Sequence, residues 1–309
     1  MSNAGQIAFV GFDIGGSKTD VVAEIPGLDG PLNLRASGEN FQKAGAKRTA
    51  SKIVSLVEQI RLRTGFEGPF RLCIGIAGAG RPEEKRELDG AICAALQDPE
   101  FRIVVLSDAE IALEGAFSGG SGMIVIAGTG SGVYATDNQG GFCRAGGWGP
   151  TIGDPGSGRQ LGLKGLRAVA RAMDGGQKTS LQIRISENLG VASRNDLIEA
   201  VYGRNLRYAD LAPLVLAEAS AGDDVATRIV FREVRALARD ASVAASTHEP
   251  IEPRIVLIGG LFNDAYYREA LGKALLDAIP EFHIVSPEAT PSEGALRIAR
   301  SITGPANAT

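Results

Sequence analysis

Apolar runs and glycine-rich turns follow one another in the same way at two places in the chain. Residues 7–12 are mostly apolar, a polar turn follows at 13–19, and an apolar run then continues to residue 25. The stretch that begins at Met123 repeats this scheme around a break at 128–132. Each pattern predicts a strand, a tight turn and a returning strand.

Other apolar residues recur at helical spacing. Ile53, Leu56, Val57 and Ile60 recur at the spacing of one helix face. Helices are also predicted at about 82–96, 109–117, 157–173, 193–202, 209–220, 223–247, 262–278 and 292–302, with short strands at 71–76, 101–106, 254–258 and 282–285. Strands that alternate with helices predict an α/β protein.

The glycine turns favour a phosphate ligand. Glycine lets the backbone come close to a ligand and directs several N–H groups toward one point. Two such turns, each beside small hydroxyl residues, suggest two halves that face one polyphosphate. The alternative is a set of tight hairpins in an ordinary β-rich region.

Composition excludes several classes of function. The chain has 309 residues, enough for two medium domains, and a net charge of −4 with no basic cluster in the sequence, so neither a nucleic-acid nor a membrane partner is expected. Three scattered cysteines and the absence of a charged leader before the first apolar run favour a cytoplasmic protein. With only two histidines, acid–base chemistry falls mostly to carboxylates.

Four glycine motifs occur in order along the chain: Asp-x-Gly-Gly-Ser-Lys-Thr at 13–19, Ala-Gly-Thr-Gly-Ser at 127–131, Gly-Gly-Trp-Gly followed by Gly-Asp-x-Gly-Ser at 146–157, and Ile-Gly-Gly at 258–260. Together with Ser107-Asp108 at a predicted strand end, they resemble the BadF/BadG/BcrA/BcrD-type ATPases. Within that family the N-acetylglucosamine kinase branch is the most similar. The resemblance extends from Phe9 to about Leu296 and is weakest between 174 and 215.

The resemblance implies the actin-like ATPase fold, with two α/β domains of the ribonuclease-H type, mixed sheets flanked by helices, and an active-site cleft between them. We expect an N-terminal domain at 1–118, a C-terminal domain at 119–289, and a last helix at about 290–309 that packs back on the first domain. A homodimer is a further expectation from the family.

The resemblance also implies roles for matching residues, with ATP and Mg²⁺ as cofactors. Asp13 matches the acidic position that holds Mg²⁺, usually through water, and Asp108 matches the carboxylate that takes the proton from the sugar hydroxyl. Nucleotide-binding positions are Gly15, Gly16, Ser17, Lys18, Gly128, Thr129, Gly130, Gly259 and Gly260. Sugar-binding positions are Asn40, Asp108, Ser131, Gly132, Gly147, Trp148, Gly149 and Asp154.

Several of these residues have an alternative structural role. Asp108 and Asp154 each precede a predicted helix and are also typical N-terminal caps. Asp13 could instead accept hydrogen bonds from N–H groups of its own turn, and Lys18 could be a solvated side chain on a strand. Trp148 could be an aromatic residue of the core.

The implied activity is transfer of the γ-phosphate of ATP to the 6-hydroxyl of N-acetylglucosamine. Glucosamine is the alternative substrate, because the loop after Asn40 departs from the family pattern. An activator-type ATPase that acts on a partner enzyme belongs to another class. Its iron–sulfur cluster needs cysteines, and Cys73, Cys93 and Cys143 lack the short spacing of cluster ligands. A sugar-binding regulator is the third possibility, and it would need a DNA-reading extension.

Overall fold

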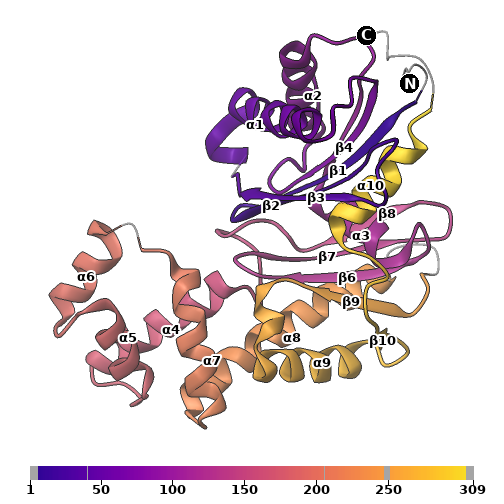
Figure 1. Ribbon diagram of the computed structural model, residues 1–309. Coiled ribbons are helices and arrows are strands. Elements are labelled where there is room, and N and C mark those ends of the chain that lie inside the picture. The colour runs from indigo at the N-terminus through magenta and orange to yellow at the C-terminus, as the bar shows by residue number, and fades with distance from the viewer. Residues whose placement is uncertain (1–5, 40, 205, 247–250, 304–309) are drawn as a thin grey trace. The chain divides into compact units, whose positions relative to one another are not determined.

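The computed structural model describes residues 6–39, 41–204, 206–246 and 251–303 (Figure 1). The chain divides into two compact units. Unit 1 comprises residues 1–120 and 287–309, and unit 2 comprises residues 121–286. No helix in the described ranges is both long and apolar enough to span a membrane.

Unit 1 is built on a mixed five-stranded sheet with the order β3-β2-β1-β4-β5. β1 is antiparallel to β2 and parallel to β4, so the glycine turn at 15–17 lies at the end of a hairpin beside parallel strands. The elements are β1 (Ala8–Ile14), β2 (Lys18–Glu24), β3 (Leu32–Ser37), α1 (Phe41–Thr64), β4 (Phe70–Ile76), α2 (Pro82–Leu96), β5 (Arg102–Ser107), α3 (Asp108–Phe117) and α10 (Pro291–Ser301).

The two faces of the unit 1 sheet carry different helices. Val10 and Phe12 are fully buried in the core that α1 and α2 close. On the other face, a Cβ on Gly11 would lie 2.2 Å from the backbone nitrogen of Leu296, so α10 packs directly on β1. Because successive strand residues alternate between faces, Asp13 lies on the same face as Gly11.

Unit 2 contains a second mixed five-stranded sheet, with the order β10-β9-β6-β7-β8. The β6–β7–β8 meander is antiparallel, whereas β9 is parallel to β6. Its elements are β6 (Gly122–Ala127), β7 (Ser131–Thr136), β8 (Phe142–Ala145), α4 (Gly158–Met173), α5 (Leu181–Leu189), α6 (Arg194–Gly203), η1 (Tyr208–Leu211), α7 (Ala212–Ser220), α8 (Asp224–Ser246), β9 (Arg254–Ile258), η2 (Gly260–Asn263), α9 (Ala265–Ala278) and β10 (His283–Ile284).

The apolar stripe of α8 anchors the core of unit 2. Val230, Val234, Leu237 and Ala241 are almost fully buried and belong to one cluster with the inward residues of β6 and β7. Apolar residues at this spacing lie on one face of a helix. α4 packs against η1, α7 and α8, and α8 in turn packs against β7 and β8 of the sheet (Figure 1).

The expected α/β class, with two mixed sheets flanked by helices, is confirmed. Two local predictions are wrong. The helix α5 was not predicted, because it is only nine residues long and its Ile183 is exposed, which blurs the apolar stripe. The single helix predicted at 209–220 is a 3₁₀ turn followed by α7, which starts near Pro213, where a proline fits the first turn of a new helix.

Candidate active site

The glycine turn of unit 1 is an exposed loop tied down at both ends. The N–H of Gly15 donates to the carbonyl of Lys18 at 2.9 Å, and the N–H of Gly38 donates to the carbonyl of Ser17 at 3.0 Å. Gly16 and Ser17 themselves are exposed. The turn can therefore present its backbone to a ligand without losing its fold. Asn40, predicted to bind sugar, lies outside the described residues.

Asp13 and Asp20 face each other across the β1–β2 pair but have opposite electrostatic environments. Burial, reinforced by the charge of Asp108, raises the pKa of Asp13 to about 6. Burial also acts on Asp20, but hydrogen bonds from Lys18 and Arg35 outweigh it and hold the pKa of Asp20 below its usual range. Lys18 is thus engaged with Asp20 at 2.6 Å, on an exposed surface.

Asp108 is the first residue of α3 and does not cap it. The cap is Ser107, whose hydroxyl accepts from the N–H of Glu110, while the Glu110 carboxylate accepts from the N–H of Ser107 at 2.7 Å. One carboxylate oxygen of Asp108 accepts from the N–H of Ala109 at 3.0 Å. Burial raises the pKa of Asp108, although its backbone hydrogen bonds act in the opposite direction, and Glu110 adds to the rise.

The sheet register explains why the two carboxylates interact. Ser107 pairs with Ile76 on β4, and Ile76 pairs with Ile14 on β1. Asp13 and Asp108 therefore belong to the same C-terminal edge of the sheet, where α/β proteins collect ligands. Two partly buried carboxylates at one edge resist simultaneous ionisation, which makes at least one of them a stronger base than an exposed aspartate.

Asp13 is also suited to a divalent cation. Mg²⁺ prefers oxygen ligands and is usually held through one or two carboxylates together with phosphates and water. None of the other described residues donates a hydrogen bond to the Asp13 carboxylate. Groups of three or more metal-binding side chains are absent from the described ranges, so Asp13 would share Mg²⁺ with phosphate and water.

The second glycine turn is joined to the start of a helix and to the end of β9. The N–H of Gly158, the first residue of α4, donates to the carbonyl of Gly128 at 2.8 Å. Across the parallel β6–β9 pair, a Cβ on Gly259 would lie 2.2 Å from the carbonyl oxygen of Ala127. Within unit 2, the glycine turn at 128–130, the glycines at 259–260 and the N-terminus of α4 therefore lie close together. Such an arrangement favours the binding of a phosphate.

The predicted sugar-binding residues of unit 2 form one compact group around Asp154. Its carboxylate accepts from the N–H of Gly149 at 3.0 Å, and the hydroxyl of Ser131 donates to the carbonyl of Pro155 at 2.6 Å. Asp154 has a φ of 57°, a left-handed conformation that aspartate tolerates better than most residues. Helix α4 is capped by Ser157, so capping does not explain Asp154. Gly132 is buried next to Tyr134.

Trp148 does not belong to the core, because 71% of its surface is exposed. Its indole lies 5.8 Å from the guanidinium carbon of Arg144, which also hydrogen-bonds the carbonyls of Gly146 and Gly147. A cation over an aromatic face holds the ring in place while leaving its other side open. An exposed aromatic in a glycine loop is suited to stacking on a sugar ring.

Two groups of this region were not predicted. Glu233 of α8 is 2% exposed, accepts from the N–H of Gly156 at 3.1 Å and pairs with Lys164. Tyr267 of α9 donates to the carbonyl of Gly156 at 2.7 Å. Both residues are more than 70 positions away from Gly156 in sequence, so no local sequence pattern predicts their contacts with it.

A separate hollow of about 400 Å³ opens beside Thr129. Its other lining residues are Arg159, Val201, Leu206, Arg207, Tyr208 and Ala209. The guanidinium carbon of Arg159 lies 5.2 Å from the centre of the Tyr208 ring. The hollow adjoins the glycine turn, and its aromatic and apolar walls are typical of sites that bind small organic ligands.

Comparison with known proteins agrees with these motifs. The model of the BadF/BadG/BcrA/BcrD ATPase family matches residues 10–299. The N-acetylmuramic acid/N-acetylglucosamine kinase of Clostridium acetobutylicum is 33% identical over 309 residues, which cover 94% of this chain and 98% of that protein. The N-acetyl-D-glucosamine kinase of Dictyostelium discoideum is 29% identical, with 94% and 97% covered.

Solved structures give the same result for the fold. The crystal structure of a proposed N-acetylglucosamine kinase from Chromobacterium violaceum matches with a TM-score of 0.76 at 25% identity, and 94% of this chain and 98% of that chain are covered. The family match and the shared fold therefore both extend over nearly the whole chain. The protein belongs to the BadF/BadG/BcrA/BcrD ATPase family.

Proposed function

We propose that the protein is an ATP-dependent amino-sugar kinase that transfers the γ-phosphate of ATP to the 6-hydroxyl of N-acetylglucosamine. The family and the names of its relatives support a kinase that acts on an amino sugar. The observation that carries the proposal is the partly buried carboxylate of Asp108, placed with Asp13 at the C-terminal edge of the unit 1 sheet.

Asp108 is the proposed general base. A sugar hydroxyl attacks phosphorus well only when its proton is leaving, so a carboxylate within hydrogen-bond reach is required. Backbone N–H groups, among them that of Ala109, orient this carboxylate, which would accept the proton of the sugar hydroxyl. The raised pKa makes the ionised carboxylate a better proton acceptor than an exposed aspartate. As the proton of the 6-hydroxyl passes to Asp108, the sugar oxygen forms a bond to the γ-phosphorus, the bond from that phosphorus to the oxygen that bridges to the β-phosphate breaks, and ADP leaves.

The phosphates of ATP are assigned to the glycine turns. The N–H groups of Gly15 and Gly128 donate within the turns, to the carbonyls of Lys18 and Gly130. The N–H groups of Gly16, Thr129 and Gly130 would therefore neutralise the phosphate charge, and the N-terminus of α4 adds its dipole at the second turn. When bound through Asp13, Mg²⁺ would supply further charge neutralisation on the phosphates. The hollow lined by Arg159 and Tyr208 is the proposed position of the adenine.

The sugar is assigned to the group around Asp154. The carboxylate of Asp154 has one oxygen bound to Gly149, so its second oxygen is available to a sugar hydroxyl. Burial raises the pKa of Asp154, while the Gly149 hydrogen bond, Arg144 and Arg159 act to lower it. Trp148 offers an exposed aromatic face, and the next residue, Gly149, donates its N–H to this carboxylate.

The cysteines argue against an activator-type ATPase. Cys73 is fully buried in unit 1 and Cys143 is buried in unit 2, which leaves Cys93 as the one exposed thiol among the described residues. A cluster at a subunit interface needs accessible thiolates, whereas burial raises the pKa of both Cys73 and Cys143. A cytoplasmic location and a homodimeric state stay predictions.

ADP release with Mg-ATP and a panel of sugars tests the proposal. We expect strong stimulation by N-acetylglucosamine and little by glucose. N-acetylmuramic acid belongs in the panel, because a relative that is 33% identical is named for both sugars. A preference for glucosamine would keep the mechanism and change the sugar pocket. Steady ATP hydrolysis that no sugar stimulates would contradict the kinase.

A further inference from the structure

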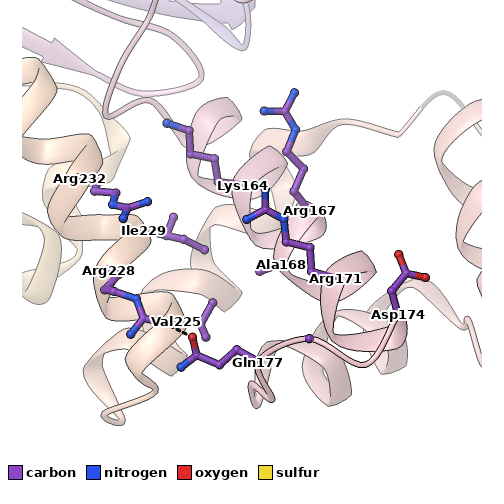
Figure 2. Close-up of a pocket in the computed structure, with 11 residues that line it drawn as sticks. Lys164, Arg167, Ala168, Arg171, Asp174, Gln177, Val225, Arg228, Ile229 and Arg232 are labelled. Carbon is purple, nitrogen blue, oxygen red and sulfur yellow. Dashed lines mark hydrogen bonds between the residues drawn. The ribbon is translucent and has the colours of Figure 1, made fainter.

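A cavity in the helical part of unit 2 concentrates positive charge, although the chain as a whole carries a net charge of −4. The cavity has a volume of about 630 Å³ and lies between α4 and α8 (Figure 2). Five cationic side chains line it, with a single carboxylate at its edge: Lys164, Arg167, Arg171, Arg228, Arg232 and Asp174.

The arginines come in two pairs, each spaced one helical turn apart. Arg167 and Arg171 lie on α4, and Arg228 and Arg232 lie on α8, so the two helices present like charges to the same hollow (Figure 2). Like charges four residues apart on a helix destabilise it, and two such pairs around one cavity add to this repulsion. An anion in the cavity would relieve it.

The protein itself supplies few counter-charges. Within the described part of the chain, Arg167, Arg171 and Arg232 have no ion-pair partner. Arg228 hydrogen-bonds the neutral amide of Gln177, and Asp174 is engaged by Arg194 at 3.0 Å. The guanidinium groups are exposed to solvent and so are accessible to a ligand.

The lining indicates the chemistry of that ligand. A planar guanidinium donates two parallel hydrogen bonds to a phosphate, and arginine suits such contacts better than lysine does. The cavity also has an apolar part, formed by Ala168, Val225 and Ile229. Its volume is in the range of sites for small organic ligands. We propose that this cavity binds a small organic phosphate, with its carbon skeleton on the apolar part.

A chain of contacts links the cavity to the predicted sugar-binding group. Lys164, at the rim, pairs with the buried Glu233, and the other oxygen of Glu233 accepts from the N–H of Gly156 at 3.1 Å. Gly156 lies two residues after Asp154. A phosphate that draws Lys164 toward itself weakens the Lys164–Glu233 pair and loosens the hold on Gly156. Occupancy of the cavity is thereby transmitted to the loop at 153–157.

Calorimetric titration with glucose 6-phosphate tests the site. The double variant Arg171→Gln/Arg232→Gln removes one guanidinium from each helix. The control Arg63→Gln/Arg86→Gln removes the same charge from exposed helix positions in unit 1. We expect the dissociation constant to rise at least tenfold in the first variant, and to stay within twofold of wild type in the control. Binding should also weaken as salt is added.

Hydrogen–deuterium exchange places the ligand. In the wild type and in the control, glucose 6-phosphate should slow exchange at 164–174 and 225–232 and alter it at 153–157, and the pocket variant should lose all these effects. Equal affinity and equal protection in the pocket variant and the wild type would overturn the site. Protection of the cavity with no change at 153–157 would overturn the transmission to the sugar-binding loop.

Discussion

The candidate functional groups of unit 1 and those of unit 2 are of different kinds. In unit 1 the chemistry lies in side-chain charge, with Asp13 and Asp108 partly buried at one sheet edge. In unit 2 it lies in backbone shape, with the turn at Gly128–Gly130 held between the start of α4 and the glycine at the end of β9. The groups of unit 1 should therefore be sensitive to a change of charge at constant shape. The glycine turn of unit 2 should be sensitive to a single added methyl group.

The largest effect is expected from Asp108→Asn, which keeps the shape and removes the base. Turnover with N-acetylglucosamine should fall by about 10²–10⁴-fold, while ATP binding measured by calorimetry stays within twofold. Asp224→Asn is the control, because Asp224 is likewise the first residue of a helix but lies in no predicted site. If Asp108→Asn retained more than a tenth of wild-type turnover, Asp108 would not be the base.

Gly259→Ala tests the backbone packing around the glycine turn of unit 2. The added Cβ would meet the Ala127 carbonyl oxygen at 2.2 Å, and Gly259 has a φ of 126°, a conformation that is costly for alanine. We expect the free energy of unfolding to fall by about 3 kcal/mol or more. Gly260→Ala is the matched control, since nothing lies within 4 Å of its Cβ. Equal stability of the two variants in urea titrations would contradict the packing at this turn.

Asp13→Asn and Asp20→Asn should have opposite effects on stability. Because the pKa of Asp13 rises to about 6 from 3.8, the folded protein binds more protons than the unfolded chain between these pH values. The contribution of Asp13 to the free energy of unfolding thus decreases as the pH rises through this window. At pH 7, Asp13→Asn should stabilise the protein by about 1–3 kcal/mol.

Asp20 provides the comparison for Asp13. Its lowered pKa and its partners Lys18 and Arg35 make the charged form favourable, so Asp20→Asn should destabilise the protein at pH 7 by about 0.2–1 kcal/mol, as expected of exposed ion pairs. Urea titrations at pH 4.5 and pH 7 measure both variants. Loss of stability in Asp13→Asn at pH 7 would contradict the electrostatic account of unit 1.

Asp154 should be sensitive both to the loss of its carboxylate and to a change of its backbone conformation. Asp154→Ala removes the acceptor for Gly149 and places alanine at a φ of 57°, so the KM for the sugar should rise about tenfold or more. Asp154→Asn keeps an oxygen acceptor and tolerates the conformation, so its KM should rise less. Steady-state kinetics with varied sugar distinguishes them. Equal KM values for the two variants would show that the loop geometry does not matter.

The smallest effect on folding is expected at Trp148. Because its side chain is 71% exposed, Trp148→Ala should change the free energy of unfolding by less than about 0.5 kcal/mol. The KM for the sugar should nevertheless rise severalfold if the indole stacks on the ring, and Trp148→Phe should restore part of the loss. An unchanged KM would leave the indole without a role in sugar binding.

The candidate groups of unit 1 were easier to predict than those of unit 2. The Ser107–Asp108 junction and the first glycine turn follow local patterns, and the fold class follows from strands that alternate with helices. The Ser-x-x-Glu pattern of Ser107 and Glu110 is a capping box, and it could have assigned the cap to Ser107 from sequence alone.

Long-range contacts were beyond sequence reasoning. Glu233 reaches Gly156 across 77 positions, and the two arginine pairs of the cavity are about 60 residues apart in the chain, so each looks like an ordinary solvated helix face. Only tertiary packing brings α4 and α8 together. Charge that is dispersed in sequence can therefore be concentrated in space, although the net charge is −4.

The central claim is that phosphate is transferred from ATP to the 6-hydroxyl of N-acetylglucosamine. Two-dimensional NMR that correlates phosphorus with the sugar protons of the purified product tests it most directly. The account predicts a correlation from phosphorus to both protons on carbon 6. A correlation to the anomeric proton, or ATP hydrolysis that yields only inorganic phosphate, would contradict it.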